Sequence, residues 1–218
     1  MVSRPVALKQ LSMIESFVVG RAPRLAAQGW SEEWQTLISI VLSARTRDDV
    51  TIRVCEGLFK KYKTANSLSR ASLPALETSI HSVNFFRNKA RSVSGCAKML
   101  VEDFDGRVPH EFDKLLLLSG VGRKTANVFL SEMGVSAIGV DTHVFQIARF
   151  LGWSKSSTPE GVEKDLKALF LRKEWSRINE SLVSFCQLHR SRKKWVEVLN
   201  TVKKCAPMKK LVFRSRNL

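Results

Sequence analysis

The sequence has few acidic residues and no long apolar run, and each shortage excludes a class of protein. Lys and Arg number 36 against 20 Asp and Glu, so the 218 residues carry a formal net charge of +16. No apolar run approaches the ~18 residues of a membrane-spanning helix. Polar residues interrupt the N-terminal segment, which is therefore atypical of a secretory signal. The positive charge favours a polyanionic partner, with nucleic acid ahead of a membrane surface.

Paired cysteines are also missing. The four cysteines, Cys55, Cys96, Cys186 and Cys205, are widely separated and form no C-x-x-C pair. This distribution is typical of reduced thiols in an intracellular protein. Each of them is also compatible with the ordinary role of a small buried hydrophobic residue.

The alternation of apolar and polar residues that marks a half-buried strand is absent over any useful length. Apolar residues instead recur at helical spacing, for example in residues 5–19, 89–100 and 175–188. Ser31, followed by two glutamates, is expected to cap a helix that runs to Ser43. The sequence predicts an all-α protein, long enough for one large domain or two small lobes.

The stretch from Leu115 to Asp141 carries the strongest functional signal. An apolar helix end leads into Ser-Gly-Val-Gly at residues 119–122, and a second helix opens with Arg123 and Lys124. Glycine lets the backbone approach a ligand closely because it has no Cβ. A helix N-terminus offers free N–H groups and the positive end of its dipole, which suit a phosphate. The stretch therefore predicts a phosphate-binding turn followed by a lysine and an acid.

The C-terminal region differs from the rest in charge. Residues 190–218 hold ten Lys or Arg and one acid, Glu197, so ten minus one gives +9, more than half of the total charge. A solvated tail and an arm on the DNA backbone are both compatible with this composition. At least one helix of this region is expected to pack on the body of the protein, as indicated by the apolar residues Trp195, Val196, Val198, Leu199 and Val202.

Two sequence segments, LSGVGRKTANVFL at 118–130 and VDTHVFQIARFLGW at 140–153, resemble the helix-hairpin-helix, Gly-Pro-Asp motif of the endonuclease III superfamily of DNA glycosylases. LSARTRD at 42–48 and VNFFRNKA at 83–90 are similar to two further segments of that family. The resemblance runs in order through roughly residues 30–185.

The resemblance implies an all-α fold of two helical lobes with a DNA-binding cleft between them. We expect a central lobe of about residues 27–134 that carries the hairpin. A discontinuous second lobe would combine residues 1–26 and 135–218, supply Asp141 and end in the basic tail. We expect the protein to act as a monomer.

Lys124 and Asp141 fall at the positions of the family's catalytic lysine and aspartate. The resemblance implies that Lys124 attacks the sugar C1′ and forms a Schiff base, for which its amine must be unprotonated. A helix terminus contributes only ~0.3–1 kcal/mol, so we expect a shielded pocket around Lys124. Asp141 would steady positive charge on the sugar and also cap the helix at Thr142. A tight pair between the two would oppose activation, so we expect both to face one sugar-sized space.

Backbone N–H groups at Gly120, Gly122 and Arg123 are expected to hold a DNA phosphate. The resemblance also implies a monovalent cation on three backbone carbonyls, those of Leu116, Leu118 and Val121.

A base inside a duplex must be flipped out before it can react, and protein side chains must fill the space it leaves. By resemblance these side chains are Arg45 and Phe85, where the family commonly has glutamine and an aliphatic residue. Arg45 would offer a donor fork suited to guanine, and Phe85 a stacking wedge. A plain surface arginine and a core phenylalanine remain the alternatives.

Several departures from the family pattern leave the base preference open. Leu116 is apolar where the thymine-glycol-type enzymes carry an acid, and Ser119 replaces the usual proline. The family also ends with cysteines spaced C-x6-C-x2-C-x5-C that hold an iron–sulfur cluster. After Cys96 this chain has only Cys186 and Cys205. We therefore expect no cluster and no required cofactor, with apolar packing and the basic tail in its place.

The sequence thus predicts a base-excision DNA glycosylase with β-elimination (AP-lyase) activity on damaged or mismatched pyrimidines in double-stranded DNA. We expect it to act inside the cell, and we expect abasic sites to be among its DNA substrates. One alternative is a glycosylase of different base choice, for adenine or for T or U opposite G. The other is a catalytically silent DNA-binding protein, against which the presence of both Lys124 and Asp141 argues.

Overall fold

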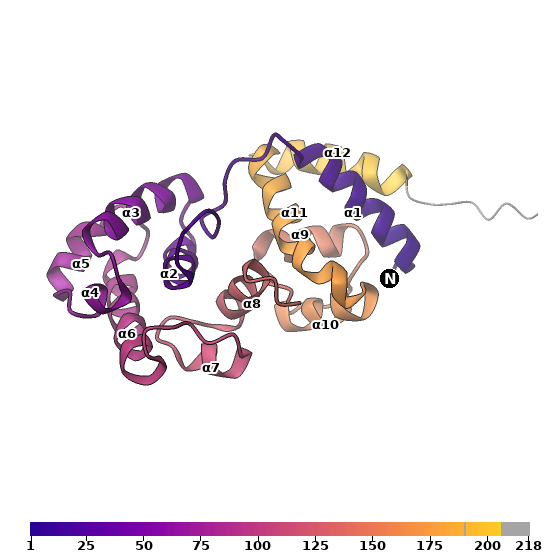
Figure 1. Cartoon of the computed structure of the whole chain (residues 1–218). Helices are drawn as coiled ribbons and strands as arrows, with labels where there is room; N and C mark the ends of the chain where they lie inside the picture. The colour runs from indigo at the N-terminus through magenta and orange to yellow at the C-terminus, as the bar shows by residue number, and fades with distance from the viewer. Residues whose placement is uncertain (190, 206–218) are drawn as a thin grey trace, which may run out of the picture.

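A computed structural model describes residues 1–189 and 191–205, and every regular element in them is a helix (Figure 1). The prediction of an all-α protein is confirmed. Within these residues no helix is both long and apolar enough to cross a membrane. Of the predicted basic C-terminal region, residue 190 and residues 206–218 lie outside the described part of the chain.

The helices follow one another with short connections. In chain order they are α1 (Arg4–Val18), α2 (Glu33–Ser43), α3 (Asp48–Lys61), α4 (Ala65–Ser69), α5 (Leu73–Ser79), α6 (Phe86–Phe104), α7 (Phe112–Leu117), α8 (Arg123–Glu132), α9 (Thr142–Phe150), α10 (Pro159–Leu169), the 3-10 turn η1 (Arg172–Glu174), α11 (Trp175–His189) and α12 (Arg192–Cys205).

The prediction that Ser31 caps α2 is wrong. Glu32 is the capping residue, and the side chain of Gln35 accepts its N–H at 3.3 Å in a reciprocal capping box. The Ser31 hydroxyl also donates to the Gln35 side chain, at 3.1 Å. The helix therefore begins one residue later than expected, because Gln35 rather than Ser31 completes the cap.

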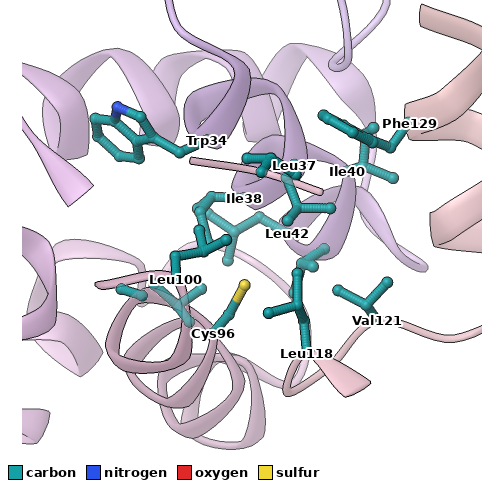
Figure 2. Close-up of a cluster of buried hydrophobic side chains, with 14 of the residues drawn as sticks. Trp34, Leu37, Ile38, Ile40, Leu42, Cys96, Leu100, Leu118, Val121 and Phe129 are labelled. Atoms are coloured by element: carbon teal, nitrogen blue, oxygen red, sulfur yellow. The ribbon is translucent and has the colours of Figure 1, made fainter. Parts of the chain in front are cut away.

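The buried side chains form two clusters, and α2 is central to the first. Its residues from Trp34 to Leu42 are all buried, which is typical of a helix surrounded by others. Figure 2 shows α2 side chains packed against Cys96 of α6, against Val121 of the turn between α7 and α8, and against Phe129 of α8. The first cluster thus anchors the turn that the sequence marks as functional.

The second cluster joins segments from both ends of the chain. Helix α1 crosses from the N-terminus to lie beside α11 and α12 (Figure 1). Trp153 and Phe185 are the largest residues of this second cluster that are fully enclosed. From α12, Trp195, Leu199 and Val202 are buried in it, so the prediction that a helix of the basic region packs on the body is confirmed. The two clusters meet near α8, between Ala137 and Ile138.

Candidate active site

The turn between α7 and α8 is built on two glycines with different tasks. Gly120 has φ +79°, and a Cβ there would lie 2.5 Å from the Cβ of Ser92 on α6. A Cβ at Gly122 would meet no atom within 4 Å. Gly120 is therefore required by the turn and by close packing, whereas Gly122 leaves open space at the start of α8. That open space is where the first N–H groups of α8 lack helical partners.

Buried residues hold this turn in place. Leu118 and Val121 are 2% and 6% exposed, and the Val121 N–H donates to the Leu118 carbonyl at 3.0 Å. Leu116 is 40% exposed. The cation expected on these three carbonyls stays a prediction.

Lys124 and Asp141 each stand at the beginning of a helix. Lys124 is the second residue of α8 and is half-buried. Asp141 caps α9, where its Oδ1 accepts the Val144 N–H at 2.8 Å. The expectation that Asp141 is a helix cap is thus confirmed.

The segment before Asp141 lies tightly against α8. A Cβ at Gly139 would come within 2.4 Å of a Val128 methyl group, and the Gly139 carbonyl accepts from the Asn179 side chain at 2.8 Å. His143, one residue into α9 from its start, is exposed.

A further charged residue, Asp48 at the start of α3, interacts electrostatically with Lys124 and Asp141. The sequence analysis did not predict it. Its Oδ1 accepts the Ala26 N–H at 3.2 Å, and its Oδ2 accepts from the Gln187 side chain of α11. Burial raises the pKa of Asp48; the Ala26 N–H and the Lys124 ammonium oppose this, and Asp141 adds to it. Asp48 is therefore electrostatically coupled to both Lys124 and Asp141. The only local signal for it was the position at the end of LSARTRD.

The Arg123 side chain pairs with a buried carboxylate. Its guanidinium donates to the Glu163 carboxylate at 2.8 and 3.1 Å and lies over the Phe112 ring, 5.2 Å from its centre. Glu163 is 3% exposed and also accepts from Asn127 at 3.1 Å and Lys167 at 2.6 Å. The ion pair attaches the start of α8 to α10 and engages two of the guanidinium nitrogens of Arg123. The sequence signal that could have identified Glu163 is a charged residue on the face of α10 that otherwise carries apolar residues.

Arg45 and Phe85 lie on two neighbouring segments, residues 44–46 after α2 and 84–85 before α6, which we term the wedge loops. The Arg45 guanidinium carbon is 5.2 Å from the centre of the Phe85 ring. Both residues are exposed, Phe85 to 56%, so the core alternative for Phe85 is wrong. Both have left-handed backbones, with φ 56° and 60°. Such strain costs ~1–3 kcal/mol for each non-glycine residue and is concentrated at functional sites.

A family comparison matches residues 38–171 to the HhH-GPD superfamily of base excision DNA repair proteins. The chain belongs to this superfamily. Its relatives include endonuclease III of Thermotoga maritima, 41% identical over 169 residues that cover 77% of this chain and 78% of the relative. Endonuclease III of Synechocystis is 39% identical over 151 residues, or 68% of this chain and 69% of the relative.

Solved endonuclease III structures share the HhH-GPD fold of this chain. A non-covalent endonuclease III–DNA complex superposes with a TM-score of 0.82 at 31% identity, over 94% of this chain and 99% of the other. A trapped covalent endonuclease III–DNA intermediate with an estranged adenine gives a TM-score of 0.81 at 33% identity, over 88% and 90%.

The three cysteines whose side chains the structure describes are all buried. Cys55 and Cys96 are buried in the first cluster and Cys186 in the second. Burial raises the pKa of each of these thiols to about 12, as expected of small apolar core residues. In the described part of the chain, no three His, Cys, Asp or Glu residues gather as metal ligands.

Proposed function

We propose that this protein is a base-excision DNA glycosylase with AP-lyase activity that removes damaged or mismatched pyrimidines from duplex DNA. The observation that carries the proposal is the position of Lys124 and Asp141, each at the start of a helix of the HhH-GPD fold, where both influence the pKa of the half-buried Asp48 carboxylate. The similarity to endonuclease III supports the reaction class.

In this reaction the Lys124 amine attacks C1′ of the flipped nucleotide, and the bond from C1′ to the base breaks. The base leaves with the bonding electrons and takes up a proton. Asp141 stabilises the positive charge that develops on the sugar. Opening of the sugar ring gives a Schiff base on Lys124. Loss of a C2′ proton then expels the 3′ phosphate, which is the β-elimination step.

DNA would be held by the hairpin and opened by the wedge loops. The N–H groups near Gly120, Gly122 and Arg123 would bind a phosphate, with a monovalent cation on the nearby carbonyls as a proposed aid. Arg45 and Phe85 would enter the duplex and replace the flipped nucleotide. The exposure of both side chains and their contact with each other support this role.

The two lobes, residues 27–134 and residues 1–26 with 135–218, would close on DNA from either side. We further propose that the enzyme works as a monomer inside the cell and needs no cofactor. Burial of Trp195, Leu199 and Val202 supports α12 as the structural replacement for the iron–sulfur cluster.

Borohydride reduction tests the proposal, because it converts a Schiff base into a stable amine. Duplexes with one damaged pyrimidine, one mismatch or one abasic site are incubated with the protein and borohydride. We expect a covalent protein–DNA adduct, which Lys124→Ala abolishes and Lys98→Ala, a change at an exposed lysine of α6, retains.

The same panel decides between the alternatives. Excision confined to adenine, or to T or U opposite G, would replace the pyrimidine-lesion preference. Tight DNA binding without product or adduct from any duplex would refute the glycosylase and favour the silent DNA-binding protein.

A further inference from the structure

Lys89 is a buried lysine that has no role in the proposed reaction or in the proposed binding of a phosphate. It lies in the first turn of α6 and is 7% exposed. Three oxygens surround its Nζ: the carbonyls of Leu42 and Ala44 at 2.6 and 2.7 Å, and the Thr46 hydroxyl at 2.9 Å. An ammonium has three protons and no acceptor, so these three bonds use its full donor capacity.

Within the part of the chain that the structure describes, the surroundings of Lys89 offer its charge polar partners but no opposite charge. A cation near the start of α6 opposes the dipole of that helix, but the same cation lies at the carbonyl end of α2, where a cation is stabilised. No carboxylate accepts from it among the described residues. Burial lowers the pKa of Lys89 to about 8, with no charged group contributing. A buried cation without an opposite charge departs from the usual pattern of a core, and such departures are expected at functional or strained sites.

The contacts of Lys89 lead directly to both wedge loops. Besides accepting from Lys89, the Thr46 hydroxyl accepts the Asn84 N–H at 3.1 Å. The Asn84 side chain in turn donates to the Arg45 carbonyl. Lys89 lies only four residues after Phe85, and its backbone N–H donates to the Phe85 carbonyl at 3.0 Å. One amine thus connects the end of α2, Thr46, Asn84 and the start of α6.

This network stabilises the left-handed backbone conformations of Arg45 and Phe85, which arginine and phenylalanine rarely adopt. Arg45 and Phe85 are two of the three non-glycine residues with positive φ in the described chain. Their side chains meet across the two loops, with the Arg45 guanidinium carbon 5.2 Å from the centre of the Phe85 ring. A wedge that keeps this form before DNA arrives avoids the ordering cost on binding.

We propose that Lys89 is the positioning residue of the wedge: its amine fixes the two loops in register so that Arg45 and Phe85 are ready to enter the duplex. The inference rests on the proposed function and deepens it. It assigns no chemical step to Lys89, whose protons are engaged and whose amine is covered. Loss of the network would impair opening of the duplex and leave the reaction of an already accessible sugar intact.

The test separates duplex opening from chemistry. The duplex probe carries 2-aminopurine opposite a tetrahydrofuran abasic analogue, which cannot react, so its emission reports entry of the wedge beside the orphan base. The chemistry probe is borohydride trapping on single-stranded DNA with a natural abasic site. Lys89→Met, which keeps most of the length of the side chain and removes the amine, is compared with Lys98→Met on the exposed face of α6.

We expect Lys89→Met to reduce the emission change at saturating protein by about tenfold, while trapping on single-stranded DNA stays within about twofold. Lys98→Met should match the wild type in both assays. Equal emission changes for Lys89→Met and the wild type, with trapping retained, would overturn the inference alone. A wild type that neither changes the emission nor forms an adduct would instead refute the proposed function.

A milder variant covers the case in which Lys89→Met fails to fold, as judged by its thermal melt. Thr46→Val keeps the shape of the side chain but removes the hydroxyl that links Lys89 to Asn84. We expect an emission change about threefold smaller than that of the wild type and unchanged trapping on single-stranded DNA. Wild-type emission from a folded Thr46→Val protein would contradict the relay through Thr46 and with it the inference.

Discussion

The hairpin turn and the wedge loops both depart from helical geometry, but they do so by opposite means. The turn reaches positive φ at Gly120, where no side chain resists it. The wedge loops reach positive φ at Arg45 and Phe85, where a Cβ makes this conformation costly by ~1–2 kcal/mol per residue. The turn is therefore relaxed by its own sequence, whereas the wedge loops need support from elsewhere in the fold.

The two regions also differ in how they balance a buried charge. Near the turn, the Glu163 carboxylate accepts hydrogen bonds from the side chains of Arg123, Asn127 and Lys167. Under the wedge loops, Lys89 has only neutral oxygens as partners. An ion pair between opposite charges, such as that of Glu163, holds two helices together. A buried cation with only neutral oxygen partners, such as Lys89, is stable only while all of its hydrogen bonds are formed.

The largest effect should come from placing a side chain in the relaxed turn. Gly120→Ala would force alanine into φ +79° and bring its Cβ within 2.5 Å of Ser92. We expect a loss of ~2–4 kcal/mol in the free energy of unfolding, because strain and overpacking add. Chemical denaturation measures it. Gly122→Ala is the matched control, since open space surrounds that position; equal losses in both variants would contradict the account of the turn.

The reverse change in the wedge should affect activity and spare stability. Phe85→Gly removes both the stacking ring and the strain at φ 60°. We expect an unfolding free energy within ~1 kcal/mol of the wild type, because relief of strain offsets the flexibility of glycine. Single-turnover excision from duplex DNA should fall by at least about tenfold. A large loss of stability would show that Phe85 is a packing residue and not a wedge.

The smallest effect concerns the far end of α8. Burial, and then the neighbouring Glu180, raise the pKa of Glu132 to about 7. A carboxyl whose pKa is raised in the folded state favours folding below its unfolded value of about 4.5, and this contribution is lost as the pH rises through about 7.

Glu132→Gln should therefore be more stable than the wild type at pH 8, by on the order of 1 kcal/mol after allowance for solvent screening, or ~2–4 °C in Tm. At pH 4.5 the two proteins should melt together. Thermal melts across this range, with the exposed Glu102→Gln as control, measure the difference. A gap that does not change with pH would contradict the sign.

The contrast also explains what the sequence could and could not predict. The hairpin was predictable because its determinants are adjacent: two glycines, a helix start and Lys124 fall within six residues of one another. The cap at Asp141 was predictable for the same reason. Arg45 and Phe85 were found through family resemblance, but nothing local signals a left-handed backbone at an arginine or a phenylalanine.

The supporting residues were hidden because their partners are distant in the sequence. Lys89 binds carbonyls more than forty residues before it, and Asp48 binds Gln187 from the other end of the chain. Glu163 reaches Arg123 across forty positions. Each of these side chains looks like an ordinary surface charge until the helices pack. The misplaced cap at Ser31 had a smaller cause, since two adjacent residues competed for one role.

The central claim is that Lys124 forms the covalent intermediate, and the chain offers a demanding comparison. Lys89 has the lowered pKa that activated lysines share, yet its amine is buried and donates to three oxygens. Borohydride-trapped wild-type protein, digested and sequenced by mass spectrometry, identifies the lysine that carries the sugar remnant. The account predicts the adduct on Lys124 and an unmodified Lys89. An adduct on Lys89, or on any other amine with Lys124 unmodified, would contradict it.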